Sequence, residues 1–148
     1  MPKIEMEWQR FDALTTDALY DLLRFRQSIF VVEQRSPFPD LDGLDQGAWH
    51  LLLRADGALA GCARLIPSPL RIGRVAIVAA LRRHGLGRRL MNEALRFCNE
   101  HYPGLPVALT AQAYLVAFYR GFGFEPSGEP FDDFGLTHVD MELRRLPD

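Results

Sequence analysis

Apolar and polar positions follow two different periods along the chain. Residues 4–11 alternate apolar and polar side chains, which predicts a half-buried strand at the edge of a sheet. Thr15 or Thr16 can cap a helix, and apolar residues follow at helical spacing: Leu19, Leu22, Leu23, Ile29 and Phe30. The chain therefore begins with a predicted strand and a helix, and Arg26 lies on the apolar stripe of that helix.

Later elements are predicted from apolar runs, helical periodicity and turn residues. Asp56-Gly57 between two apolar segments is a strong hairpin signal. The pattern predicts, in chain order, a loop at 35–47, a hairpin of 48–54 and 59–67, a central strand at 71–79, a helix from about 85 to 101, a strand at 106–110, a helix at 112–120, and strands at 124–131 and 138–143 separated by a loop at 132–135. This order predicts a single α/β (α+β) domain over residues 1–148.

Composition narrows the class of protein. With 148 residues, 48% of them apolar, the chain can bury a core, and a net charge of −2 provides no basic field for a nucleic acid. Acidic residues within the first twenty positions exclude a signal peptide, and no apolar stretch approaches eighteen residues. We therefore expect a cytoplasmic protein with no membrane or nucleic-acid partner. Cys98 lies on an apolar helical stripe, which indicates a buried thiol.

The most informative stretch runs from Arg82 to Arg89, between a predicted strand and a predicted helix. Unpaired N–H groups at a helix start attract anions, and glycines at 85 and 87 allow an anion to approach closely. Four arginines add positive charge: Arg82, Arg83, Arg88 and Arg89. These features predict a diphosphate site, although the residues match neither a P-loop nor G-x-G-x-x-G. The alternative is a helix start whose glycines serve packing and whose arginines lie in solvent.

The pattern R-x-x-G-x-G from Arg82 to Gly87, after the strand RVAIVA, resembles the acyl-CoA pyrophosphate loop of GNAT acetyltransferases. Residues 112–124 (QAYLVAFYRGFGF) resemble a second motif of that superfamily, N-x-x-A-x-x-x-Y-x-x-x-G-F. Four further segments resemble its ElaA-type branch: FVVEQ at 30–34, DLDGLD at 40–45, IGRV at 72–75 and GLTHVDM at 135–141. Leu115 and Gln112 depart from the alanine and asparagine that are commoner at those positions.

The resemblance implies a central mixed, mostly antiparallel sheet that is splayed at the cofactor-binding strand and flanked by helices. It also implies acetyl-CoA as cosubstrate, with no metal. By the same resemblance, the residues beside the cofactor would be Ala76, Ile77 and Val78 on the strand, Arg83, His84, Gly85, Leu86, Gly87 and Arg88 in the loop, and Gln112 on the pantetheine.

The resemblance selects Tyr119 as the general acid for the departing CoA thiolate, and the alternative is a core aromatic with its hydroxyl at the rim. A backbone N–H near Ile77 is the expected donor to the developing oxyanion. The general base stays open among five residues: Glu33, His50, Asp42, Asp45 and His138.

The acceptor is expected opposite the cofactor, against Phe30, Glu33 and Gln34. The entrance would be lined by Phe38 and by Asp40, Asp42 and Asp45, where the aspartates would attract a cationic amine. The alternative for the aspartates is a solvated turn, and the alternative for Glu33 is an ion pair, with Arg26 as a candidate partner.

These observations favour an acetyl-CoA-dependent N-acetyltransferase that acts on an amine of a small molecule or peptide. A non-catalytic acyl-CoA sensor or partner-binding module is the second hypothesis, and a regulatory domain that binds ATP or NAD is the third. Phe131 and Phe134 could serve a homodimer contact or ordinary surface packing.

Overall fold

The computed structural model describes residues 1–37 and 39–145. In this part of the chain, strands form one sheet in the order β1-β2-β3-β4-β5-β8-β6, with β7 paired to β8. The strands are β1 (Ile4–Arg10), β2 (Trp49–Ala55), β3 (Ala58–Pro67), β4 (Leu70–Ile77), β5 (Val107–Gln112), β6 (Glu125–Pro126), β7 (Phe131–Asp133) and β8 (Leu136–Leu143). Neighbouring strands are antiparallel except β4 and β5. The expected mixed, mostly antiparallel sheet is confirmed.

Helices cover both faces of this sheet. Helix α1 (Thr16–Gln27) begins where the Thr15 hydroxyl accepts the Ala18 N–H at 3.0 Å, and it continues as a π-helical segment over Ser28–Glu33. The apolar side of α1 packs on one face of the sheet, whereas α2 (Leu86–His101) and α3 (Val116–Arg120) pack on the other. Cys98 is fully buried on α2, as expected. No helix in the described ranges is both long enough and apolar enough to cross a membrane.

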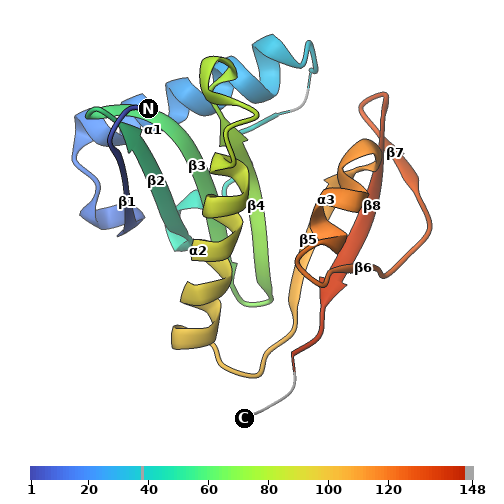
Figure 1. Ribbon diagram of the computed structural model, residues 1–148. Coiled ribbons are helices and arrows are strands. Elements are labelled where there is room, and N and C mark those ends of the chain that lie inside the picture. The colour runs from blue at the N-terminus through green and yellow to red at the C-terminus, as the bar shows by residue number, and fades with distance from the viewer. Residues whose placement is uncertain (38, 146–148) are drawn as a thin grey trace.

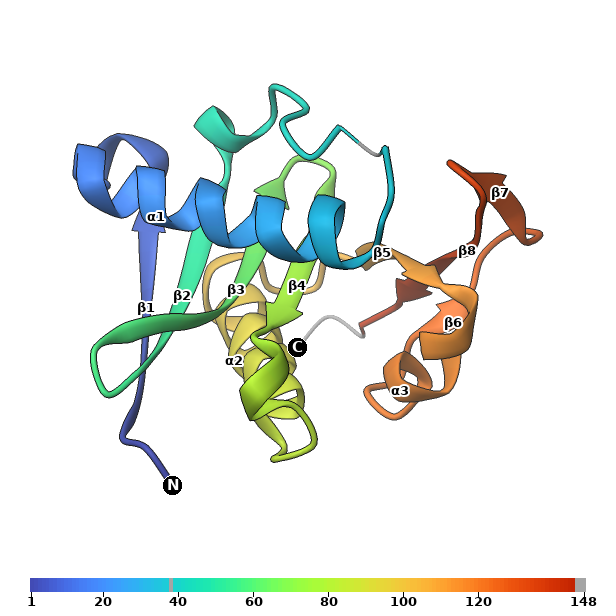
Figure 2. The same ribbon diagram turned by 90° about the horizontal axis from the view of Figure 1, so that it is seen from above.

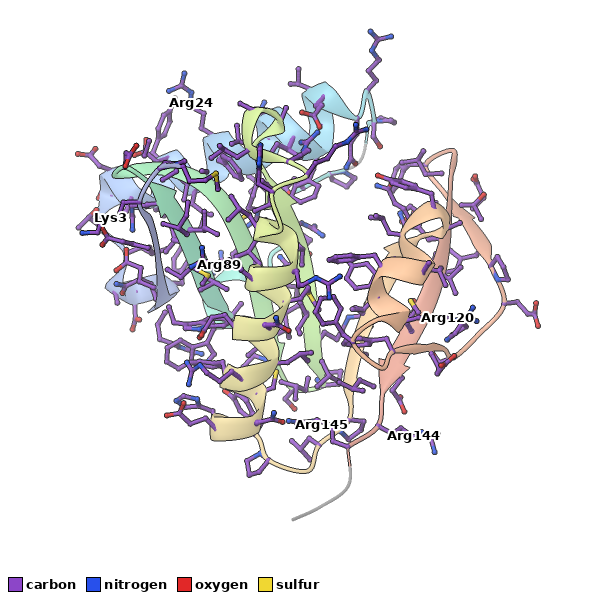
Figure 3. The ribbon with its side chains drawn as sticks, viewed as in Figure 1. Lys3, Arg24, Arg89, Arg120, Arg144 and Arg145 are labelled. Carbon is purple, nitrogen blue, oxygen red and sulfur yellow. The ribbon has the colours of Figure 1, made fainter. Side chains whose placement is uncertain are left out.

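Strands β4 and β5 diverge into a V. They pair only at Arg71 and Ala108, near the start of both strands, and separate toward the end where β4 leads into α2 (Figures 1 and 2). Arg145 holds the narrow end, where its guanidinium donates to the carbonyls of Tyr102 and Leu105 at 2.6 and 2.7 Å (Figure 3). The splay expected at this strand is therefore confirmed.

The predicted hairpin is also confirmed, because Asp56 and Gly57 both take positive φ (50° and 85°) between β2 and β3. The single strand predicted over 124–131 is wrong: β6 ends at Pro126 and β7 begins at Phe131. Two prolines in this segment lack the N–H that a strand ladder needs.

Other boundaries also differ from the predictions. Strand β4 ends at Ile77 rather than at 79, and β5 continues to Gln112 rather than ending at 110. Half of the loop predicted at 132–135 is strand, because Phe134 and Gly135 alone make a two-residue turn, with φ of 52° and 82°, and the two preceding aspartates pair with β8. The helix predicted over 112–120 begins only at Val116, since Gln112 ends β5 and a short 3-10 turn follows.

Candidate active site

Strand β4 changes its pairing with β3 at a β-bulge. Arg74 and Val75 together stand opposite Ala63, and Arg74 takes φ of 51°. The extra residue reverses the alternation of side chains, so that Ile72 before the bulge and Val75 and Ile77 after it all pack toward α2. The bulge therefore sets which backbone groups face β5 in the second half of the strand.

One edge of β4 faces β5 but pairs with it only at Arg71; we call the part beyond this residue the free edge. The Val78 N–H donates to the Ala60 carbonyl on β3 at 2.8 Å. Because successive residues direct their hydrogen-bonding groups to opposite edges, the Ile77 N–H points to the free edge. The side chain of Ala76 is buried toward α1. Among the three strand residues predicted beside the cofactor, Ile77 is thus the one that offers a backbone donor there.

The loop after β4 forms an open helix N-terminus. Residues 82–85 are exposed, and Leu86 is buried and anchors the first turn of α2. Gly85 takes φ of 78° at the N-cap position, with no side-chain cap and no acidic residue in the first turn. The first N–H groups of this 16-residue helix therefore lack intrahelical partners and face exposed backbone, which fits the diphosphate of an acyl-CoA.

The first turn of α2 also faces the segment that follows β5, the second strand of the V. A Cβ added to Gly87 would lie 3.7 Å from the Phe118 ring, and the Arg88 guanidinium lies 5.9 Å from the centre of the Phe122 ring. The predicted loop residues are thus brought together with α3.

Arg82 connects the free edge with the segment after α1. Its Nε donates to the Ile77 carbonyl at 2.9 Å, and its Nη2 lies 2.6 Å from a carboxylate oxygen of Glu33. The expectation that Glu33 pairs with an arginine is confirmed, but Arg26 is the wrong partner, because its guanidinium is buried against other carboxylates.

Polar residues from both arms meet at the open end of the V. The Gln112 amide donates to the Gln34 amide oxygen at 3.4 Å, across 78 positions of sequence. His138 stands beside Gln112 on β8, and its Nδ1 lies 2.9 Å from the Leu136 carbonyl. A carbonyl can only accept, so Nδ1 carries a proton, and this tautomer leaves Nε2 as the acceptor when the ring is neutral. Phe30, in the π-helical segment after α1, is half-buried against the apolar cluster on that face of the sheet.

Tyr119 lies on α3 between aromatic neighbours. Its ring is 5.1 Å from the Phe118 ring and 6.3 Å from the Phe124 ring, centre to centre, and only 8% of the residue is exposed. Burial, with a smaller effect from the nearby Tyr114 hydroxyl, raises the pKa of Tyr119 to about 12. The phenol therefore stays protonated at neutral pH, as a proton donor must be.

The aspartates expected at the entrance form a buried network with arginines instead. We call it the Asp–Arg network, and its ion pairs are Arg26–Asp40 (3.0 Å), Arg26–Asp45 (2.7 Å), Arg64–Asp42 (2.8 Å), Arg64–Asp45 (3.0 Å), Arg74–Asp40 (2.7 Å) and Arg74–Asp42 (3.3 Å). Asp40 and Asp45 are buried in these ion pairs, so neither sequence interpretation, an attractor of cationic amines or a solvated turn, holds for them. Asp42 is partly exposed and accepts the Leu44 N–H at 3.0 Å, so the turn interpretation holds for this residue. Phe38, the other entrance residue, lies outside the described residues.

Sequence reasoning missed Arg64 and Arg74 as partners of the aspartates at 40–45, a segment that we call the acidic loop. The available signal was an arginine inside each of two apolar strand segments, since buried charges are almost always paired.

The network removes three of the five candidates for the general base. Burial by itself raises the pKa of Asp42, but hydrogen bonds and charge from Arg64 outweigh it and lower that pKa to about 2; Asp45 is shifted in the same direction, chiefly by Arg26. His50 is buried, donates from Nε2 to the Asp45 carbonyl at 2.9 Å, and has its pKa lowered by burial. Glu33 and His138 are left beside the open end of the V.

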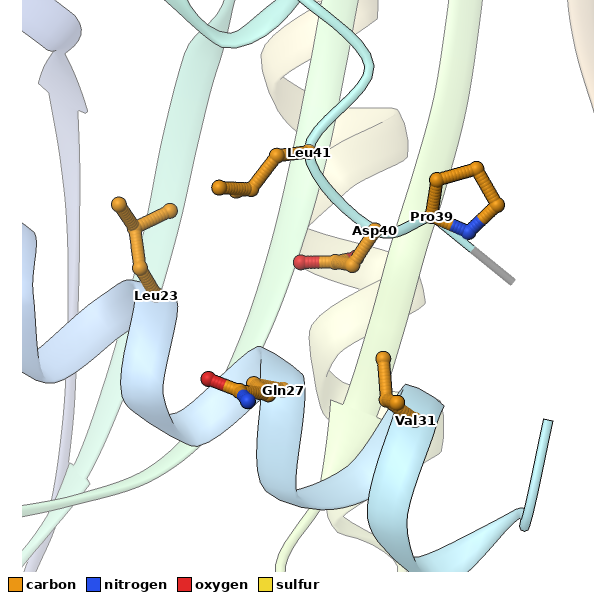
Figure 4. A pocket seen from close by; sticks show the side chains of 6 residues that line it. All are labelled: Leu23, Gln27, Val31, Pro39, Asp40 and Leu41. Atoms are coloured by element: carbon orange, nitrogen blue, oxygen red, sulfur yellow. The ribbon is translucent and has the colours of Figure 1, made fainter. Parts of the chain in front are cut away.

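A groove of about 330 Å³ lies between α1 and the acidic loop (Figure 4). Its lining residues are Leu23, Gln27, Val31, Pro39, Asp40 and Leu41. None of them comes from β4, β5 or α2, so the groove is separate from the free edge.

Comparisons with known proteins agree with this geometry. The sequence model of the acetyltransferase (GNAT) domain family matches residues 33–145. The chain is 39% identical over 152 residues to a UPF0039 protein of Synechocystis sp. (strain ATCC 27184 / PCC 6803 / Kazusa), and the alignment covers 98% of each chain.

Solved structures are similar over nearly the whole chain. The crystal structure of Escherichia coli ElaA aligns with a TM-score of 0.91 and 38% identity, covering 96% of this chain and 100% of that one. An acyl-CoA N-acyltransferase from Pseudomonas aeruginosa aligns with a TM-score of 0.90 and 35% identity, covering 95% and 99%. The chain is therefore a GNAT-type acyltransferase and belongs to the ElaA-type branch of that family.

Proposed function

We propose that this acyltransferase uses acetyl-CoA and transfers the acetyl group to a primary amine of a small molecule or a peptide. The observation that carries the proposal is that two features follow one another directly along the chain. The free edge of β4 leads through Arg82 into the uncapped N-terminus of α2. An extended pantetheine arm that ends in a diphosphate needs a strand edge followed directly by an anion site.

Different residues would contact different parts of the acetyl-CoA donor. The N–H groups of the first turn of α2, from Leu86 to Arg88, would hold the diphosphate, and the exposed Arg83 and His84 would border it. The backbone of Ala76, Ile77 and Val78 would lie beside the arm, and the Gln112 amide would contact it from β5. Bound acetyl-CoA supplies an activated thioester.

Transfer requires that the amine nitrogen bond to the acyl carbon while the carbon–sulfur bond breaks. The Ile77 N–H, which points to the free edge, would stabilise negative charge that develops on the acyl oxygen. Tyr119 would give its proton to the departing sulfur, and its phenolate would take up the proton that the new amide nitrogen loses. Because these groups are fixed in the fold, orientation supplies much of the rate.

The acceptor would lie against Phe30, Glu33 and Gln34, next to His138. Between the two remaining candidates for the base, the geometry favours His138, since its Nδ1–H is held by a carbonyl and its Nε2 can take a proton from the ammonium of the acceptor. Glu33 pairs with Arg82 and would orient the acceptor.

Calorimetric titration with acetyl-CoA tests the proposal, with ATP and NAD as controls and hexanoyl-CoA as a longer donor. A panel of a polyamine, an aminoglycoside and a peptide with a free N-terminus is then assayed by release of the CoA thiol. We expect selective micromolar binding of acetyl-CoA and thiol release with at least one amine. Binding without transfer to any amine would instead identify an acyl-CoA sensor, and no binding would overturn donor use altogether.

A further inference from the structure

The β-bulge of β4 is centred on a charged residue that is tied into the Asp–Arg network. Arg74 takes φ of 51°, a conformation that side chains other than glycine adopt at an energetic cost. Such a conformation persists only where surrounding contacts hold it. The contacts around Arg74 therefore decide whether the bulge is maintained.

Those contacts hold both the side chain and the backbone of Arg74. The guanidinium lies 2.7 Å from an Asp40 carboxylate oxygen and 3.3 Å from one of Asp42, and it donates to the Asp40 carbonyl at 2.9 Å. The Cys62 thiol on β3 donates to the Arg74 carbonyl at 3.2 Å. The bulge is thus fixed from the acidic loop on one side and from β3 on the other.

The network is balanced in charge and largely excluded from water. Three guanidinium groups face three carboxylates, and the side chains of Arg26, Arg64 and Asp40 are each at most 5% exposed. Removing one member leaves a buried charge without its partner, which destabilises the local arrangement strongly. A balanced, buried network therefore favours one position of the Arg74 guanidinium.

The bulge decides which groups of β4 reach the free edge. Without the extra residue, the alternation of β4 beyond Gly73 would shift by one position, and the Ile77 N–H would point toward β3. The pantetheine arm of the donor would then lie along a free edge that no longer presents the Ile77 N–H. The network thus acts on the donor site through the register of β4.

We infer that Arg74, held by Asp40 and Asp42, is a positioning residue for the acyl donor: it fixes the bulge that aims the Ile77 N–H at the thioester. Arg74 itself touches no reacting atom. This inference rests on the proposed function.

The test compares Arg74→Gln with Arg74→Lys, which keeps the charge, and with Asp42→Asn, which removes one of its partners. Phe97→Leu serves as a control for lost stability, because Phe97 is buried near the far end of α2 and stacks on Trp8 at 4.1 Å. Each variant is measured well below its unfolding temperature, by acetyl-CoA calorimetry and by hydrogen exchange of the amides from Val75 to Val78.

Arg74→Gln should raise the acetyl-CoA Kd by about tenfold or more and speed exchange at the four amides, whereas Phe97→Leu should leave both within about twofold. Asp42→Asn should shift both readouts in the direction of Arg74→Gln, and Arg74→Lys should recover most of the affinity. If Arg74→Gln does not fold, Arg74→Lys and Asp42→Asn carry the test by their exchange rates and Kd.

Equal Kd and equal exchange in Arg74→Gln and a Phe97→Leu variant of matched stability would overturn the inference, since a merely structural role predicts that result. The exchange measurement needs no donor. If the wild-type protein fails to bind acetyl-CoA, the proposed function fails, but exchange still shows whether Arg74 holds the bulge.

Discussion

Glu33 and Arg82 form an ion pair of 2.6 Å that joins the segment after α1 to the loop after β4. The same guanidinium donates to the Ile77 carbonyl, so the expected acceptor wall and the donor strand are linked by one side chain. Both members of the pair are 40% exposed, and exposed pairs contribute only about 0.2–1 kcal/mol to stability.

Glu33→Gln should therefore leave the unfolding temperature nearly unchanged while it raises the acceptor KM several-fold. Steady-state kinetics with a saturating donor measures this effect. Glu7→Gln is the matched control, because Glu7 also pairs with an arginine, Arg54, but lies on β1. An acceptor KM that does not change would remove Glu33 from the acceptor wall.

Gly87→Glu should abolish donor binding, because it places a carboxylate in the first turn of α2 where the diphosphate is expected. Gly87→Ala should bind nearly as well as the wild-type protein, since its Cβ would meet the Phe118 ring at an ordinary contact distance of 3.7 Å. Calorimetry with acetyl-CoA distinguishes the two variants. Undiminished affinity in Gly87→Glu would refute the position of the diphosphate.

Tyr119→Phe should lower kcat by about 10²-fold or more and change the acetyl-CoA Kd by less than about twofold, because the hydroxyl acts on the leaving sulfur rather than on donor binding. Since the pKa of Tyr119 is raised to about 12, the acid stays protonated and its role is lost only as pH rises toward that value. Tyr114→Phe, an exposed tyrosine of the same segment, is the control. Equal losses in kcat and affinity would argue against the acid assignment.

His138→Gln should lower kcat/KM by about 10²-fold at neutral pH if Nε2 takes the proton of the acceptor. The loss should shrink as pH rises, because a larger fraction of the amine is then already neutral. His101→Gln, on an exposed position near the end of α2, should have no such effect. A loss that is the same at every pH would point to a packing role for His138.

Stability should fall in acid because of Asp42. Its pKa is lowered from 3.8 to about 2 in the folded protein, so the unfolded chain binds its proton first as pH falls. The contribution, at most about 2 kcal/mol at this partly exposed carboxylate, is present above pH 4 and is lost as pH falls toward 2.

Urea unfolding between pH 7 and pH 2.5 measures this loss. Asp42→Asn should be less stable than the wild-type protein at pH 7, and the difference should narrow in acid. A constant difference across this range would exclude an ionised Asp42 as its source.

The sequence predicted those structural features whose signals lie within a few consecutive residues. The Asp56-Gly57 turn, the helix that begins beyond Gly85 and the buried position of Cys98 each depend on residues within a few positions of one another. Turn conformations and helical periodicity act over such distances, so a single sequence is enough to read them. The segment at 124–131, with Pro126 and Pro130, shows the limit of local signals, since one strand was predicted there and the structure has two short strands.

Tertiary structure decided what depends on distant pairs. From the sequence, the aspartates at 40–45 could attract a ligand or lie in solvent, but Arg64 and Arg74 reach Asp42 from strands more than twenty positions away. The partner of Glu33 and the contact of Gln34 with Gln112 were equally invisible, because each joins segments that only the folded sheet brings together. Periodicity states which face a residue takes, whereas the identity of a buried charge's partner is set by the three-dimensional path of the chain.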